Sequence, residues 1–284
     1  MFDGYEKSQK FIVTVHARTT ATLTLMRDWA FSGGAKIERA KEHVADFERA
    51  SRAFLDAHRY SAVSRYDPKR KELAFFVEGT HIVPARLASI TADAIHNLRA
   101  SLDILWHQAW SKGNSGKRKQ YFPLVRNARE LEARFKTIKQ TEQKAAVDIL
   151  RAIKPFELWN KLLALNEIDA RDKHELPVLA AATYKQVIMK LPPDVLFQGK
   201  TGLQVVAQIG SGFLFLECGT QLPIVTAIET DTGPVTHMEC DLTADIAFGP
   251  GEFLEGELVL KTLRESVEII DDIAQAFLTV GLIR

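Results

Sequence analysis

The chain has 284 residues, of which 46% are hydrophobic and 26% charged, which is the composition of an ordinary globular protein. Its 37 basic and 36 acidic residues nearly cancel, so no overall field favours nucleic acid or an anionic membrane. Cys218 and Cys240 belong to no CxxC or Cys/His pattern, which argues against a structural zinc site. The N-terminus has no signal-peptide pattern, and no apolar stretch approaches the roughly 20 residues that span a bilayer. We therefore expect a cytoplasmic protein with no membrane attachment.

The first part of the chain predicts a long helix followed by a hairpin. Over residues 35–60, apolar side chains recur at helical spacing between Glu, Lys and Arg. Residues 61–82 then change period, and two strand-like arms flank the turn signal Asp67-Pro68. This change predicts a small β-hairpin packed on a helical bundle.

Three further helices are expected before the chain changes character. One begins at Pro84, a favoured first-turn residue, and runs to about residue 110. A charged amphipathic pattern predicts a single helix over residues 130–153. The next helix covers about residues 155–174, because Pro177 forbids its continuation.

The remainder predicts strands and one closing helix. Residues 178–248 hold short apolar or alternating runs separated by Gly, Pro and Asp turn signals, which is typical of an antiparallel meander. Residues 255–280 read as an amphipathic helix that returns to the bundle. The predicted fold class is α+β, a helical bundle with an antiparallel β-sheet inserted before the C-terminal helix. The expected parts are a bundle with hairpin (1–177), a β-rich part (178–250) and the C-terminal helix (251–284).

A first polar segment lies in the helix that starts at Pro84. Within residues 93–107, four polar side chains fall within about 80° of arc on one helical face. They are His96, Arg99, Asp103 and His107. Arg99 and Asp103 are four residues apart and can pair directly. This stripe has two interpretations. It forms one wall of a site for acid–base or metal chemistry, or it is a polar face that is solvated or hydrogen-bonded to another helix.

A second polar segment closes the next helix. Asn166, Asp169 and Lys173 share one helical face, and His174 joins them if the last turn loosens before Pro177. The preceding stretch is strongly apolar, so the helix should carry Asn166 and Asp169 inward, where buried polar groups need partners. The partners that we expect are Arg99 and His96 on the other helix, in one shared network.

These two segments together resemble a widespread bacterial and phage family of uncharacterised proteins. Its members carry an "HNLRsaLD" helix and an "LNxxDKH" helix, followed by a β-rich part and a final helix. The match is carried by His96-Asn97-Leu98-Arg99, by Leu102-Asp103 and by Asp172-Lys173-His174, and it covers most of residues 36–280. The resemblance implies the architecture and the location of a site, and it implies no particular activity.

The helical part is also distantly similar to the HEPN superfamily, many of whose members are metal-independent ribonucleases of toxin–antitoxin and phage-defence systems. Their hallmark is Arg, then four to six residues, then His, and Arg52 and His58 fit that spacing. The resemblance implies an endoribonuclease without cofactor, an RNA partner, and a homodimer whose groove binds RNA. Arg would stabilise phosphate charge while His acts as acid or base. The candidate catalytic residues are His96, Arg99, Asp103, Asp169, Lys173 and His174.

Two other functions stay open. One is a metal site between helices, for which the Asp and His side chains of both segments have suitable chemistry. Against it, no Glu-x-x-His motif is present, and Arg99 and Lys173 would repel a cation. The other is a non-enzymatic interaction or ligand-binding module that binds a protein partner through its β-sheet, while the polar network fixes helix register. The absence of a nucleophile elbow, a P-loop and a Rossmann fingerprint favours this last reading.

Overall fold

The computed structural model describes most of the chain from residue 33 onward. The described residues are 33–67, 69, 72–78, 81–111, 121–125, 127–136, 141–152, 156–172, 174–190, 204–217, 219–221, 225–226, 229–230, 233–234 and 239–283. Cys218 and Lys173 lie outside them. None of the described helices is long and apolar enough to cross a membrane.

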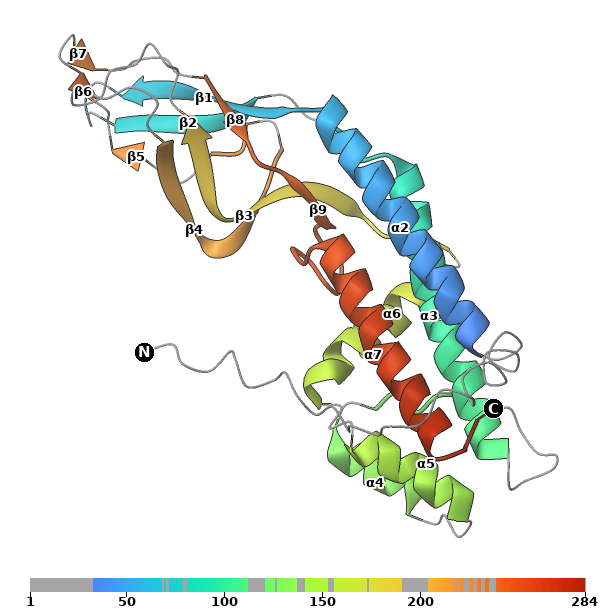
Figure 1. The fold of residues 1–284 in the computed structure, drawn as a ribbon. Coiled ribbons are helices and arrows are strands. Elements are labelled where there is room, and N and C mark those ends of the chain that lie inside the picture. Colours follow the sequence, from blue (N-terminus) through green and yellow to red (C-terminus); the bar gives the residue numbers. More distant parts are fainter. Residues whose placement is uncertain are drawn as a thin grey trace.

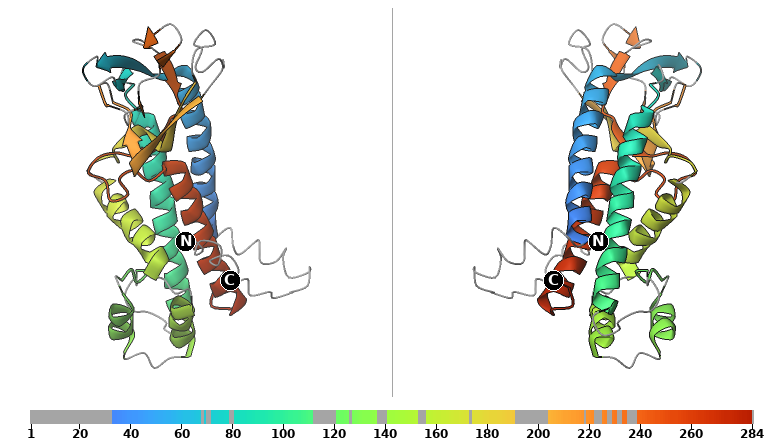
Figure 2. Two further views of the ribbon diagram at one scale, coloured as in Figure 1. Left: turned by 90° about the vertical axis from the view of Figure 1, so that its left-hand side faces the viewer. Right: turned by 90° about the vertical axis from the view of Figure 1, so that its right-hand side faces the viewer.

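Three long helices form the bundle. They are α2 (Gly33–Ala57), α3 (Ala85–Ser111) and α7 (Val259–Thr279), which lie side by side in Figures 1 and 2. Each buries an apolar stripe at helical spacing, and Phe47 of α2, Leu98 of α3 and Phe277 of α7 all belong to the core with no exposed surface. Helix α2 begins in close contact with α3, because a Cβ on Gly33 would lie 2.6 Å from Leu105 Cγ.

Helix α6 (Phe156–Asp172) packs against α3, and two short helices close the end of the bundle away from the sheets (Figure 1). These are α4 (Ala128–Phe135) and α5 (Thr141–Ala152). The prediction of a single helix over residues 130–153 was therefore wrong. The Asn127 side chain caps α4, and the break lets both short helices turn apolar side chains such as Leu131 and Leu150 into the core. Arg151 at the end of α5 bonds Glu132 in the middle of α4, which ties the two helices together.

The strands lie at the other end of the molecule in two main sheets (Figure 1). The first sheet contains the predicted hairpin, β1 (Tyr60–Asp67) and β2 (Glu72–Glu78), flanked by β5 (Val225–Thr226) and β8 (Glu239–Leu242) in the order β5-β2-β1-β8. The second has the order β4-β3-β9 and comprises β3 (Leu179–Lys190), β4 (Gln204–Phe215) and β9 (Asp245–Phe248). A small ribbon pairs β6 (Glu229–Thr230) with β7 (Gly233–Pro234).

The α+β class and the antiparallel pairing are confirmed, but the strands do not follow a meander. β9 pairs with β3, in a register that sets Leu179 opposite Phe248 and Ala181 opposite Ile246, while β8 pairs with β1 of the hairpin. Ile246 and Phe248 have no exposed surface and join the core of the bundle. Burial of these two side chains against the helices explains why β9 returns to β3, beside the start of α7.

Candidate functional site

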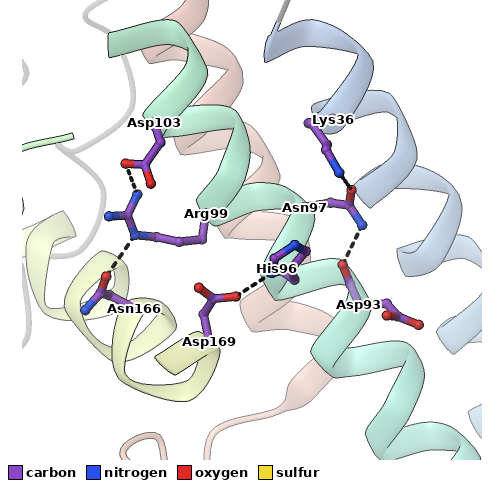
Figure 3. A network of polar contacts seen from close by, with 8 residues as sticks. All are labelled: Lys36, Asp93, His96, Asn97, Arg99, Asp103, Asn166 and Asp169. Carbon is purple, nitrogen blue, oxygen red and sulfur yellow. Dashed lines mark hydrogen bonds and ion pairs between the residues drawn. The ribbon is translucent and has the colours of Figure 1, made fainter. Parts of the chain in front are cut away.

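The two predicted polar segments meet between α3 and α6, as expected from the sequence (Figure 3). Arg99 is largely buried, with 11% of its side chain exposed. Its Nε donates to Asn166 Oδ1 at 2.8 Å, and its Nη1 donates to Asp103 Oδ1 at 2.5 Å. The same Asp103 oxygen accepts the backbone N–H of Phe122 at 2.8 Å. Arg99 and Asp103 therefore tie three stretches of chain together.

The second contact between the helices is a histidine–carboxylate pair. Nδ1 of His96 lies 2.8 Å from Asp169 Oδ1. The His96 side chain is 56% exposed and Asp169 only 17%, so a largely buried carboxylate orients an accessible imidazole. When the ring is neutral, this contact favours the proton on Nδ1 and leaves Nε2 as the acceptor that faces outward. We call His96, Arg99, Asp103, Asn166 and Asp169 the α3–α6 network.

Two further carboxylates lie within one helical turn of the His96–Asp169 pair along α3 and α6. Asp93 precedes it by one turn of α3, and Asp172 follows Asp169 by one turn of α6. Burial raises the pKa of the Asp172 carboxyl above its ordinary value, and the negative charges of Asp169 and Asp93 raise it further, while His96 acts in the opposite direction. The surroundings of the imidazole are thus negatively charged.

Asn97 supports this arrangement from the opposite side of α3 (Figure 3). The side chain is buried, its Nδ2 donates to the Asp93 carbonyl at 2.8 Å, and its Oδ1 accepts from Lys36 Nζ at 3.1 Å. Lys36 belongs to α2, so this contact ties α2 to α3. We assign Asn97 a structural role.

The end of the second segment lies apart from the network. Helix α6 ends at Asp172, two residues earlier than expected. His174 follows in a turn in which its backbone N–H donates to Arg171 O at 2.9 Å, and its side chain is exposed. No hydrogen bond or ion pair joins the His174 side chain to any described residue of the network. His107 is likewise exposed, so neither histidine is brought to His96.

The Arg–His motif of α2 is also not joined in space. Arg52 pairs with Glu48 on the helix surface, whereas His58 Nδ1 lies 2.9 Å from Phe54 O and its ring is 5.0 Å from that of His81. A cavity of about 290 Å³ opens at this end of α2, lined by residues from the helix end and from strands β1 and β8. Its lining is Leu55, Asp56, His58, Arg59, Tyr60, Leu242 and Ala244.

Sequence reasoning missed one buried charge close to the network. Glu252 lies in the β9–α7 loop with 1% of its side chain exposed, pairs with Arg171 of α6 and accepts the Val178 N–H at 2.7 Å. Arg171 lies within the second polar segment, but no sequence pattern in the Gly-rich loop indicated that Glu252 is buried. The contact fixes the exit of α6 against the loop that leads to α7.

Across the described residues, no group of three or more His, Cys, Asp or Glu side chains is placed to hold a metal ion. No protein-family model, curated protein or solved structure matches the chain. The chemistry of the site therefore has to be argued from its own geometry. That geometry has two halves, an Arg99 half whose charges are paired and largely buried, and a His96 half that is open to solvent.

Proposed function

We propose that the chain is a non-enzymatic, cytoplasmic binding module whose α3–α6 network sets the register of the helices. The observation that carries this proposal is that the Arg99 guanidinium is already hydrogen-bonded and charge-compensated within the protein. A phosphate-binding arginine presents free donors and an uncompensated charge to its ligand. The Arg99 side chain is instead only 11% exposed, donates from Nε to Asn166 and from Nη1 to Asp103, and has its charge compensated by Asp103. Such contacts hold α3 and α6 together and are typical of a structural arginine.

The charges around His96 support the same proposal. Three carboxylates, Asp93, Asp169 and Asp172, lie on the two helices beside the imidazole. Negative charge on these side chains repels an RNA backbone, because binding of RNA depends on clustered Lys and Arg.

The test combines stability with a nuclease assay. Arg99→Ala should lower the free energy of unfolding by about 2 kcal/mol, because it leaves Asp103 and Asn166 without their donor. Arg52→Ala, which removes an exposed arginine, is the matched control and should change little. Wild type and His96→Ala should both leave RNA intact, with or without EDTA. EDTA-resistant cleavage that His96→Ala abolishes would overturn the proposal.

A second candidate function is a HEPN-like, metal-independent ribonuclease of the phage-defence type. The exposed His96 ring, oriented by Asp169, favours it, because this is the arrangement of a general acid or base. Asp169 would orient the ring, and RNA would bind in the groove of a homodimer. This candidate predicts cleavage by a dimeric wild type, together with a dimer mass in light scattering. A monomer that does not cleave RNA contradicts it.

A further inference from the structure

An exposed apolar surface lies beyond the end of α6. The connection from α6 to β3 is extended at residues 175–178, so Pro177 is buried while Leu176 and Val178 face outward. The β9–α7 loop lies beside it and exposes Phe253, with 59% of the residue accessible. Phe253 is one of the most exposed large hydrophobic residues in the described part of the chain. We call Leu176, Val178 and Phe253 the apolar surface.

The backbone beneath the apolar surface is firmly held. Val178 donates its N–H to Glu252 and accepts the Gly249 N–H at 2.8 Å, so both of its backbone groups bond the β9–α7 loop. Glu252 in turn pairs with Arg171 of α6. A surface held by such bonds loses little conformational entropy when a partner binds, so less of the binding energy is lost to ordering the backbone.

The two segments that carry this surface are acidic. Residues 174–178 and 249–258 contain four glutamates and no Lys or Arg. Glu252 is compensated by Arg171, but Glu175, Glu255 and Glu257 are exposed. An exposed apolar patch that lies in acidic segments is suited to a protein partner of opposite charge. The sign is wrong for nucleic acid and for an anionic membrane, because both would be repelled.

We infer that the apolar surface docks a protein segment that carries apolar side chains flanked by Lys or Arg. This inference rests on the proposed function and names the chemistry of its partner. The apolar side chains would cover Leu176, Val178 and Phe253, and the basic groups would meet Glu175 and Glu257. Burial of the apolar contacts supplies affinity, while the opposite charges select the partner and speed its approach.

The probe is a fluorescently labelled amphipathic peptide of Leu and Lys, and its anisotropy is measured with the full chain. A peptide in which Glu replaces each Lys is the control for charge. We expect the basic peptide to bind at least about tenfold more tightly than the acidic one, and the difference to shrink between about 50 mM and about 500 mM NaCl.

Variants locate the site. Phe253→Ser and Leu176→Ser should each weaken binding of the basic peptide about tenfold, and Glu257→Lys should weaken it and reduce its salt dependence. Val280→Ser is the matched control, because Val280 is 53% exposed and stands at the far end of the 21-residue helix α7. Binding by Val280→Ser should equal that of wild type. Thermal melts verify that each variant is folded, and Leu176→Ser and Glu257→Lys report on the site if Phe253→Ser is not.

Three outcomes of the peptide titrations overturn the inference. They are equal binding of the basic and acidic peptides, equal binding by Phe253→Ser, Leu176→Ser and Val280→Ser, and an absence of peptide binding by wild type. Binding of RNA or of anionic vesicles that Phe253→Ser weakens would also overturn it, since it assigns the surface to another class of partner. All of these results test the apolar surface alone. The proposed function is contradicted by a different result, RNA cleavage that depends on His96.

Discussion

Asp103 accepts the backbone N–H of Phe122, 19 positions further along the chain, at 2.8 Å. The same Asp103 oxygen pairs with Arg99. The bond to Phe122 holds the chain that enters α4 against the middle of α3. Phe122 is buried there, and its ring lies 5.9 Å from that of Trp106. A helix-surface carboxylate thus anchors a part of the core that no local sequence pattern connects to it.

The first prediction concerns this anchor. Asp103→Ala should lower the free energy of unfolding by about 2 to 3 kcal/mol, because Arg99 and the Phe122 N–H lose their shared acceptor. Asp103→Asn keeps an acceptor without the charge and should cost about half as much. Urea titrations followed by tryptophan fluorescence measure both, since Trp106 packs on Phe122. Asp148→Ala removes an exposed partner of Arg151 and is the control. An equal loss in Asp103→Ala and Asp148→Ala would contradict the anchoring role.

The second prediction concerns the buried carboxylate of Glu252. Glu252→Ala leaves Arg171 without its partner and the Val178 N–H without an acceptor, and should cost about 3 kcal/mol. Glu252→Gln retains one acceptor oxygen and should lose less. Amide hydrogen exchange should show faster exchange at Val178 in both variants, and at Gly249 through the loop that the carboxylate fixes.

The control for this pair is Glu257→Gln, since Glu257 is exposed in the same loop. It should leave both the unfolding midpoint and the exchange of Val178 unchanged. A Glu252→Ala protein with wild-type protection at Val178 would show that the carboxylate does not hold the connection to β3.

The third prediction concerns the proton on His96. The contact with Asp169 favours the Nδ1–H tautomer when the ring is neutral. In ¹⁵N spectra of labelled protein at about pH 8, His96 should therefore show a protonated Nδ1 and an unprotonated Nε2. Asp169→Ala should shift the ring toward the Nε2–H form that is usual in water. The His96→Gln spectrum identifies the signals, and an Nε2–H tautomer in wild type would contradict the described contact.

The partners of the α3–α6 network were predictable because both segments lie on regular helices. Once the apolar stretch before Asn166 was expected to be buried, Arg99 and His96 were the expected partners of Asn166 and Asp169. The structure adds which residue pairs with which, Arg99 with Asn166 and His96 with Asp169. Whether these residues catalyse a reaction is not decided by such spacing, and the catalytic assignment stays a prediction.

Contacts that depend on loops could not be predicted in the same way. Glu252 lies among glycines, where no periodicity distinguishes a buried side chain from a solvated one. The choice of β9 as the neighbour of β3 follows from burial of Ile246 and Phe248 against distant helices, which short-range alternation does not encode. The end of α4 and the start of α5 could not be predicted either, because the charged amphipathic pattern of the sequence continues from one helix to the next.

The last prediction concerns pH and Asp172. The pKa of this carboxyl is raised in the folded protein, first by burial and then by Asp169 and Asp93. The folded state therefore holds the proton more tightly than the unfolded chain does, and stability falls as the pH rises from the ordinary pKa of Asp, about 3.9, through the raised folded value. Above that window the ionised carboxylate opposes folding. Asp172→Asn should remove this penalty and raise the urea midpoint at pH 7.

At about pH 3, Asp172 carries its proton in both states, so wild type and Asp172→Asn should have nearly equal midpoints. Asp56→Asn, at an exposed position of α2, is the matched control and should show no pH-dependent gain. Since Asp169 and Asp93 contribute to the raised pKa, Asp93→Asn should reduce the gain from Asp172→Asn at pH 7, which a double-mutant cycle measures. A destabilised Asp172→Asn at pH 7 would mean that the ionised carboxylate has a favourable partner, and the description of the His96 surroundings as an excess of negative charge would be wrong.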